Sequence, residues 1–166
     1  MGGSALRGPV RPGRRAFEWG LLLVVVLGLV LFFLQQAHQV QGQAELASIR
    51  STLGALRMTA VQDDLRARVS GQGDRPVSAQ SNPFELLQFR PGNYLGALDA
   101  AQSLTVRPGS WWFDPDCVCV VYAPLEPHWL VGASGAARLR FRVVQRAGPW
   151  ELDALEPYVW QGQRVE

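Results

Sequence analysis

An uninterrupted run of apolar residues near the start of the chain limits what it can fold into more than any other feature. The fifteen residues from Gly20 to Leu34 carry no polar side chain, and no charged residue lies between Trp19 and Ala44 when His38 is taken as neutral. A helix rises about 1.5 Å per residue, so the run reaches roughly 22 Å of a hydrocarbon core about 30 Å thick. Aromatic residues before the run and amide side chains after it suit the two interfaces. The sequence therefore predicts a transmembrane helix over residues 17–37.

The arginines of the chain predict the orientation of this helix. The first fifteen residues hold four arginines and no acid, and the next basic residue after the run is Arg50. The positive-inside rule keeps such a tail, residues 1–16, in the cytoplasm and places the rest outside. Residues 45–166 hold 12 arginines against 13 acids, so the pI of about 8.8 belongs mainly to the tail. This balance gives little reason to expect a nucleic acid as a partner.

A cleaved signal peptide would share the basic start and the apolar run. The residues that follow the run offer no good small-x-small cleavage site, because Gln35 precedes Ala37 and Glu45 precedes Ala47. No cysteine lies nearby for attachment of a lipid. We therefore favour a retained, single-pass membrane anchor over a cleaved signal.

The helix is predicted to continue beyond the membrane as residues 38–70. No proline interrupts residues 16–75, and apolar residues recur at alternating spacings of three and four, which is the pattern of a heptad seam. The seam consists of Leu46, Ile49, Leu53, Leu56 and Ala60. A cluster of glycine, aspartate and proline at residues 71–76 is a clear stop signal. We expect one helix from about Phe17 to Val69.

Two interpretations of the seam remain open. It could pack against the C-terminal domain of its own chain, or it could pair with a helix of another membrane protein. In the second case the contact residues would be Leu46, Ile49, Leu53 and Leu56. Replacing Leu53 with Asp would then weaken the complex and leave the C-terminal domain folded.

Residues 71–83 are rich in glycine, serine, glutamine and proline, which indicates a linker, and the pattern beyond them changes to a period of two. Residues 111–122 predict a strand, a turn at Asp114–Asp116, and a second strand. Residues 138–145 and 150–154 alternate between apolar and polar positions. The predicted fold class is α+β: the long helix, transmembrane and then amphipathic, packs on a small antiparallel β-sheet formed by residues 84–166, a pilin-like arrangement.

The last two predicted strands suggest a register. If Val143 lies opposite Trp150, then Phe141 meets Leu152 on the apolar face, and charged pairs fill the other face. Those pairs are Arg142 with Glu151 and Arg140 with Asp153. The arginine face, which begins at Arg138, could instead bind an acidic partner, but the cross-strand pairs are the preferred interpretation.

Few residues suggest catalysis or metal binding. Cys117 and Cys119 could form a disulfide or hold a metal, but two small buried residues in a strand are the preferred interpretation, since zinc normally needs four ligands. Ser134 lies among glycines without the spacing of a nucleophile elbow and is interpreted as a loop residue. His128, among prolines, is interpreted as a surface histidine rather than a general base. The sequence thus predicts no catalytic residue, no metal, no cofactor and no small-molecule substrate.

Several short stretches resemble the MshF-like biogenesis proteins of the mannose-sensitive haemagglutinin (MSHA) type IV pilus. They lie at residues 82–87, 91–96, 109–114, 121–122 and 139–143. The residues that carry the resemblance are Asn82, Pro83, Phe84, Asn93, Tyr94, Gly96, Trp111, Phe113 and Asp114. The resemblance implies a bitopic protein of the bacterial inner membrane with a periplasmic C-terminal domain, acting in the assembly of a type IV pilus or a related secretion apparatus. Its implied partners are the membrane and other inner-membrane proteins or pilins of that apparatus.

The alternative is a minor pilin or pseudopilin that is incorporated into the fibre. In the pilin family the leader ends in glycine before a phenylalanine, and a glutamate occupies the fifth mature position. Here Ala16 precedes Phe17, and Leu21 lies where that glutamate is expected. This departure favours a non-enzymatic accessory protein over a polymerised subunit.

Overall fold

The computed structural model describes residues 13–71, 82–135, 137–145 and 148–165. The chain divides into two compact units, one reaching to Gln41 and the other beginning at Gly42. Most of the predicted basic tail, residues 1–16, and most of the predicted linker, residues 71–83, lie outside the described residues.

The helix α1 runs without interruption from Arg14 to Val69. No proline occurs within it, so every backbone N–H after the first turn can donate to the carbonyl one turn earlier. Its C-terminal end agrees with the predicted stop, because Gly71 adopts a left-handed φ of 67° directly after it. The amide of Ser70 still donates to the carbonyl oxygen of Arg66, at 2.9 Å. The prediction of a single long N-terminal helix is confirmed.

The second unit contains a five-stranded sheet whose strand order is β1-β2-β3-β5-β6. The strands are β1 (Tyr94–Ala97), β2 (Ser110–Asp114), β3 (Cys119–Ala123), β5 (Leu139–Val144) and β6 (Glu151–Ala154). Three neighbouring pairs are antiparallel, but β1 runs parallel to β2. The sheet is therefore mixed rather than antiparallel throughout as predicted. The chain between β1 and β2 returns through a short 3-10 helix, η2 (Gln102–Thr105), and that return makes the parallel pairing possible.

A smaller sheet and two further 3-10 helices complete the described part of this unit. The small sheet has the order β4-β7-β8, and the 3-10 helices precede β1 and β4 along the chain. These elements are β4 (Leu130–Val131), β7 (Val159–Trp160), β8 (Gln163–Arg164), η1 (Pro83–Leu86) and η3 (Pro127–Trp129). The indole N–H of Trp160 donates to the carbonyl oxygen of Gly42, at 2.9 Å, and so ties the small sheet to α1. Gly42 suits this close approach, because a Cβ there would overlap the side chain of Gln161.

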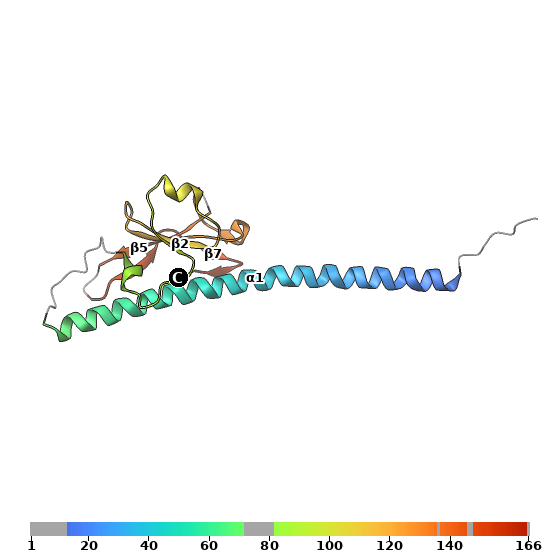
Figure 1. Cartoon of the computed structure of the whole chain (residues 1–166), viewed down its shortest axis with the longest axis horizontal. Helices are drawn as coiled ribbons and strands as arrows, with labels where there is room; N and C mark the ends of the chain where they lie inside the picture. Colours follow the sequence, from blue (N-terminus) through green and yellow to red (C-terminus); the bar gives the residue numbers. More distant parts are fainter. Residues whose placement is uncertain (1–12, 72–81, 136, 146–147, 166) are drawn as a thin grey trace, which may run out of the picture. The chain divides into compact units, whose positions relative to one another are not determined.

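The core lies between the seam of α1 and one face of the large sheet (Figure 1). Ile49, Leu53 and Leu56 are completely buried, and Leu46 is 3 % exposed. The sheet meets them with alternate residues of its strands, which are Trp111, Val120, Tyr122, Leu139, Phe141 and Val143. Burying one such aliphatic side chain stabilises a fold by about 1.5–3 kcal/mol. The seam therefore covers the sheet of its own chain, which is the first of the two interpretations that the sequence left open.

The register of β5 and β6 differs from the predicted one. Val143 lies opposite Leu152 rather than Trp150, and Arg142 lies opposite Asp153 rather than Glu151. The observed pairing is displaced by two residues, which leaves every side chain on its predicted face. A period-two pattern cannot distinguish registers that differ by two residues, because both satisfy it equally. The alternation itself is confirmed, since Leu139, Phe141 and Val143 are buried while Arg140 and Arg142 are exposed.

We expect Leu53→Asp to unfold the second unit rather than spare it. The variant places a carboxylate in a completely buried apolar position. The resulting destabilisation of several kcal/mol is a large part of the free energy of unfolding of a small domain. Urea denaturation followed by tryptophan fluorescence measures the loss. Ser51→Asp, which lies two residues before Leu53 on the exposed side of α1, is the matched control and should retain the wild-type midpoint. A folded Leu53→Asp protein would contradict this description of the core.

Candidate contact surface

The first unit is a helical segment with a largely exposed apolar surface. Within the described residues, α1 is the one helix that is long and apolar enough to cross a membrane. Every large apolar side chain from Leu21 to Leu34 is at least 48 % exposed. Exposed apolar side chains in such a continuous run are foreign to a water-soluble surface. The predicted span, Gly20 to Leu34, thus lies on a helix that has the length and composition to span a bilayer.

The seam residues are unavailable to a partner. Leu46, Ile49, Leu53 and Leu56 are between 0 and 3 % exposed, and all four belong to the core cluster. A partner helix could reach them only by displacing the sheet. The expectation that these residues contact another protein is therefore corrected, and a helix that pairs with this part of α1 would have to bind another of its faces.

Such a face exists on nearly the opposite side of the helix. Seven exposed residues follow alternating spacings of three and four, and we call them the outer stripe: Ala44, Ala47, Ser51, Gly54, Met58, Val61 and Leu65. At about 100° per residue, the outer stripe lies roughly 150° around α1 from the seam. The seam and the outer stripe are thus two heptad patterns on one helix, one buried and the other exposed.

The outer stripe changes character along its length. Its first four residues are small, and its last three are large and apolar, with Met58 61 %, Val61 44 % and Leu65 55 % exposed. Nothing lies within 4 Å of a Cβ built at Gly54, so the surface there is open. Small residues allow a second helix to approach closely, and the burial of large apolar residues stabilises the contact. The sequence offered this signal in the spacing of Met58, Val61 and Leu65, but the stronger seam obscured it.

The residues that carry the family resemblance have structural roles. The Asn82 side chain accepts from the amide of Phe84, at 3.1 Å, and donates to the Tyr94 hydroxyl, at 2.6 Å. The rings of Phe84 and Tyr94 stack with centroids 4.1 Å apart. Pro83 occupies the first turn of the 3-10 helix η1, where its missing N–H costs nothing. Together these four residues join η1 to the edge strand β1.

The remaining members of that set support the β1–β2 pair and the turn after it. The Asn93 side chain donates to the carbonyl oxygen of Gly109, at 2.7 Å, and its own carbonyl accepts from the amide of Trp111. Trp111 and Phe113 are buried, and Gly96 adopts a φ of 97° that suits glycine. Asp114 accepts from the amide of Asp116, at 3.1 Å, within the β2–β3 turn. None of these groups is arranged around a ligand; they position the backbone.

A buried carboxylate links α1 to strand β3. Glu45 is 6 % exposed, and its Oε1 accepts from the Tyr122 hydroxyl, at 2.8 Å, and from the amide of Leu125, at 2.7 Å. Burial, together with the neighbouring Glu45 carboxylate, raises the pKa of Tyr122 far above its ordinary value. Charge-assisted hydrogen bonds of this kind are stronger than neutral ones. Sequence reasoning missed Glu45, because a single acid within an amphipathic helix gives no sign of its burial.

The two cysteines are joined. Cys117 and Cys119 form a disulfide with their Cα atoms 5.2 Å apart, and Cys117 lies in the turn before β3 rather than in the strand. Cys119 is buried in a strand, as the preferred interpretation expected, but the two cysteines are bonded, which is the alternative that the sequence left open. The sequence had placed both thiols within reach of each other but could not show that they pair. In the chain-entropy account, closing so short a loop adds only about 1.6 kcal/mol of stability.

The other residues considered for chemistry are not assembled into a site. His128 lies 3.5 Å from Glu126, and both side chains are more than half exposed. Ser134 lies in a loop, as predicted, and its hydroxyl and amide both donate to Glu156; these hydrogen bonds lower the pKa of that carboxyl. Among the described residues, no group of three or more His, Cys, Asp or Glu side chains could hold a metal ion.

One arginine of the arginine face beside β5 makes contacts within its own chain. Arg138 donates to the carbonyl oxygen of Ser103, at 2.7 Å, and its guanidinium lies 5.2 Å from the ring centroid of Trp112. These contacts hold the segment around η2 against the outer face of the sheet, where Trp112, Cys119 and Val121 form a second apolar cluster. The outer stripe therefore remains the described surface best suited to a helical partner.

The chain matches no protein-family model, no curated protein and no solved structure. The residues themselves must therefore carry the argument for function.

We expect the tyrosines to resist ionisation until the second unit unfolds. Burial raises the pKa of Tyr94, Tyr122 and Tyr158, which are all three tyrosines of the chain. The folded state then keeps protons that the unfolded state releases, so these groups stabilise the fold fully below pH about 10 and lose that contribution as the pH rises further. Tyrosinate absorbance should appear together with the loss of circular dichroism. Tyr122→Phe should make the alkaline loss of stability less steep. Tyrosinate formation in a still folded protein would contradict the expectation.

Proposed function

We propose that the protein is a non-enzymatic accessory protein of the bacterial inner membrane that acts in assembly of a type IV pilus or a related secretion apparatus. The N-terminal tail lies in the cytoplasm, and the second unit lies in the periplasm. The observation that carries this proposal is the outer stripe: the same helix that can span a membrane continues into an exposed heptad pattern that its own domain leaves uncovered.

Two further observations support this placement. Disulfides persist in oxidising compartments such as the periplasm, so the Cys117–Cys119 bridge favours a periplasmic second unit. The arginines that precede the span favour a cytoplasmic tail. The resemblance to MSHA pilus biogenesis proteins suggests that the apparatus is a type IV pilus. The pilin-like arrangement of one long helix on a sheet is consistent with this proposal.

The occupant of the outer stripe is, in this proposal, a helix of another protein anchored in the same membrane. A shared anchor makes the two helices parallel and raises their effective concentration, since both leave the bilayer on the same side. Arg50 and Arg57 lie on one flank of the outer stripe, and both are exposed. Charged residues beside a heptad interface select the partner, so we expect acidic residues on the facing flank of the partner helix.

The test is a cell that lacks the gene and is supplied with variants. The double variant Met58→Glu, Leu65→Glu places two charges on the outer stripe without touching the core, so it should accumulate normally, remain folded and fail to restore surface pili. Loss of fibre should exceed about tenfold, because burying two unpaired carboxylates in a helix pair costs several kcal/mol. The yield of fibres sheared from cells is the measurement.

The matched control is the double variant Ser48→Glu, Arg66→Glu. Both positions are exposed on α1 and lie about 90° around the helix from the outer stripe. This control should restore pili to the wild-type level. Normal piliation with both double variants would exclude the outer stripe as the contact surface, and normal piliation without the gene would exclude the function.

The second candidate is a minor pilin or pseudopilin, which the pilin-like arrangement of helix and sheet also fits. The two candidates differ at the N-terminus, since a pilin is cleaved and then polymerised. We expect the mature chain to retain Arg14 and Arg15, because Ala16 stands in place of the leader glycine. Mass spectrometry of the protein purified from membranes decides between them. A mature chain that begins at Phe17 would favour the fibre subunit.

A further inference from the structure

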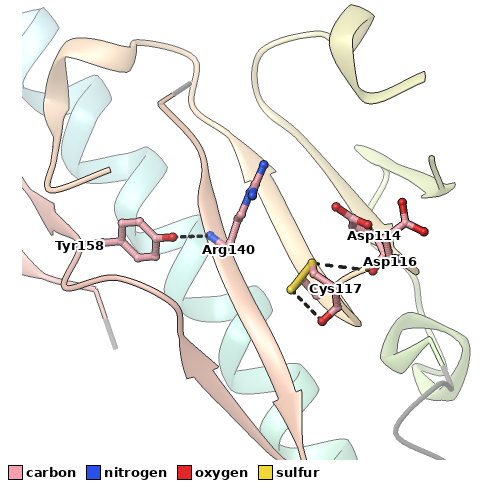
Figure 2. Close-up of a disulfide and its surroundings, with 6 residues drawn as sticks. Asp114, Asp116, Cys117, Arg140 and Tyr158 are labelled. Carbon is pink, nitrogen blue, oxygen red and sulfur yellow. Dashed lines mark hydrogen bonds between the residues drawn. A yellow bond between two sulfur atoms is a disulfide. The ribbon is translucent and has the colours of Figure 1, made fainter. Parts of the chain in front are cut away.

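The turn between β2 and β3 holds a disulfide in surroundings that suit two redox states. Figure 2 shows the bridge between Cys117 and Cys119 beside Asp114 and Asp116. A disulfide stabilises a protein mainly by restricting its unfolded chain, and a loop closed across two residues of sequence separation restricts that chain very little. Stability alone therefore gives a weak reason for this bridge.

The residue between the cysteines is held in a strained conformation. Val118 has a φ of 55°, in the left-handed region that β-branched residues rarely adopt. Such outliers persist only where their surroundings impose them, and they concentrate at functional positions. Here the residue is fixed from both sides by the two bridged cysteines. Breaking the bridge would remove one of the constraints that hold Val118 in this conformation.

Each sulfur atom faces a backbone carbonyl oxygen. Sγ of Cys119 lies 3.2 Å from the carbonyl oxygen of Cys117, and Sγ of Cys117 lies 4.0 Å from that of Asp114 (Figure 2). A disulfide sulfur has no hydrogen to donate, whereas a thiol has one. Reduction would therefore turn two contacts between acceptors into two weak S–H···O hydrogen bonds. These weak hydrogen bonds would favour the dithiol form of the turn.

The two sulfurs differ in access. Cys119 is completely buried with Trp112 and Val121, while Cys117, in the turn, is partly exposed. In the sheet Cys119 lies between Asp114 of β2 and Arg142 of β5, whose charges oppose each other. Access rather than charge therefore selects the sulfur that is attacked. An external thiolate can reach Cys117, and Cys119 is then the leaving group.

We propose that the Cys117–Cys119 disulfide is a redox-active site that exchanges with a dithiol of a partner protein. A partner thiolate attacks Sγ of Cys117, the bond between the two cysteines breaks, and Cys119 leaves as a thiolate that takes up a proton. The second thiol of the partner, as its thiolate, then attacks the mixed disulfide and releases Cys117, which is protonated in turn. Two electrons and two protons pass to this chain, and the partner dithiol becomes a disulfide.

The reduced form differs at one end of the large sheet. The carbonyl oxygen of Val118 accepts from the amide of Val143, at 3.0 Å, so the turn is connected to strand β5. Release of Val118 from its left-handed conformation alters this connection. The redox state of the turn thereby affects the end of the sheet where the turn meets β5, and Val118 there packs against the core cluster that includes the α1 seam.

The test equilibrates the full-length protein, in detergent, with glutathione buffers of increasing reducing strength, followed by alkylation and intact mass measurement. We expect the wild type to pass from the disulfide to the dithiol within the range that glutathione sets. Val118→Gly relieves the backbone strain, so half-reduction should require at least roughly fivefold stronger reducing conditions. Val118→Ala keeps a Cβ and serves as the matched control, with a midpoint nearer the wild type.

Single variants test which sulfur is attacked. Cys119→Ser should form a mixed disulfide when oxidised glutathione is added, whereas Cys117→Ser, which leaves only the buried thiol, should not. A wild-type disulfide that stays intact at the strongest glutathione buffer would overturn the proposal, as would a Val118→Gly midpoint equal to or below that of the wild type. Adduct formation at Cys119 alone would overturn the direction of attack. These outcomes do not depend on piliation, so they are separate from the proposed function.

Discussion

The burial of the α1 seam against the large sheet is the interaction on which the rest of the second unit depends. The sheet has one apolar face made by alternate residues of its strands, and water cannot cover that face without a large cost. Ile49, Leu53 and Leu56 cover it completely. The hydrogen bonds from Trp160 to Gly42 and from Tyr122 to Glu45 then fix the helix along and across the sheet. Apolar burial supplies the stability, and these polar contacts supply a single orientation.

Because of this packing, the two parts of α1 have different surroundings. Its first part exposes apolar side chains of the kind that lipid accepts, and its later part has one face in the protein core. Among the described residues, the outer stripe is a further apolar feature of the helix, and it lies outside the core. A sequence that needed only solubility would carry polar residues at Met58, Val61 and Leu65. A further helix packed on these residues would account for them, and the proposed function rests on this surface.

The patterns in the sequence predicted those features that depend on period and composition. The heptad seam and the alternation of β5 each require a buried apolar face, and the structure supplies it. The apolar run lies on a helix that is long and apolar enough to cross a membrane. The features that depend on long-range pairing were missed. A two-residue change of register keeps every side chain on its face, so Val143 could be assigned to Trp150 as readily as to Leu152. The parallel strand β1 and the burial of Glu45 depend on contacts between segments far apart in the sequence, which no local pattern records.

The disulfide illustrates the same limit and also extends the functional argument. Spacing brought Cys117 and Cys119 within bonding distance of each other, but the difference in their exposure and the strain at Val118 come from the β2–β3 turn. The turn lies in the same sheet whose other face is covered by α1, so the two features occupy separate surfaces of one small domain. A helix partner on the outer stripe leaves the turn free to react, because the sheet lies between the seam and the cysteines. The fold can therefore accommodate the proposed assembly contact and the proposed redox-active turn on separate surfaces.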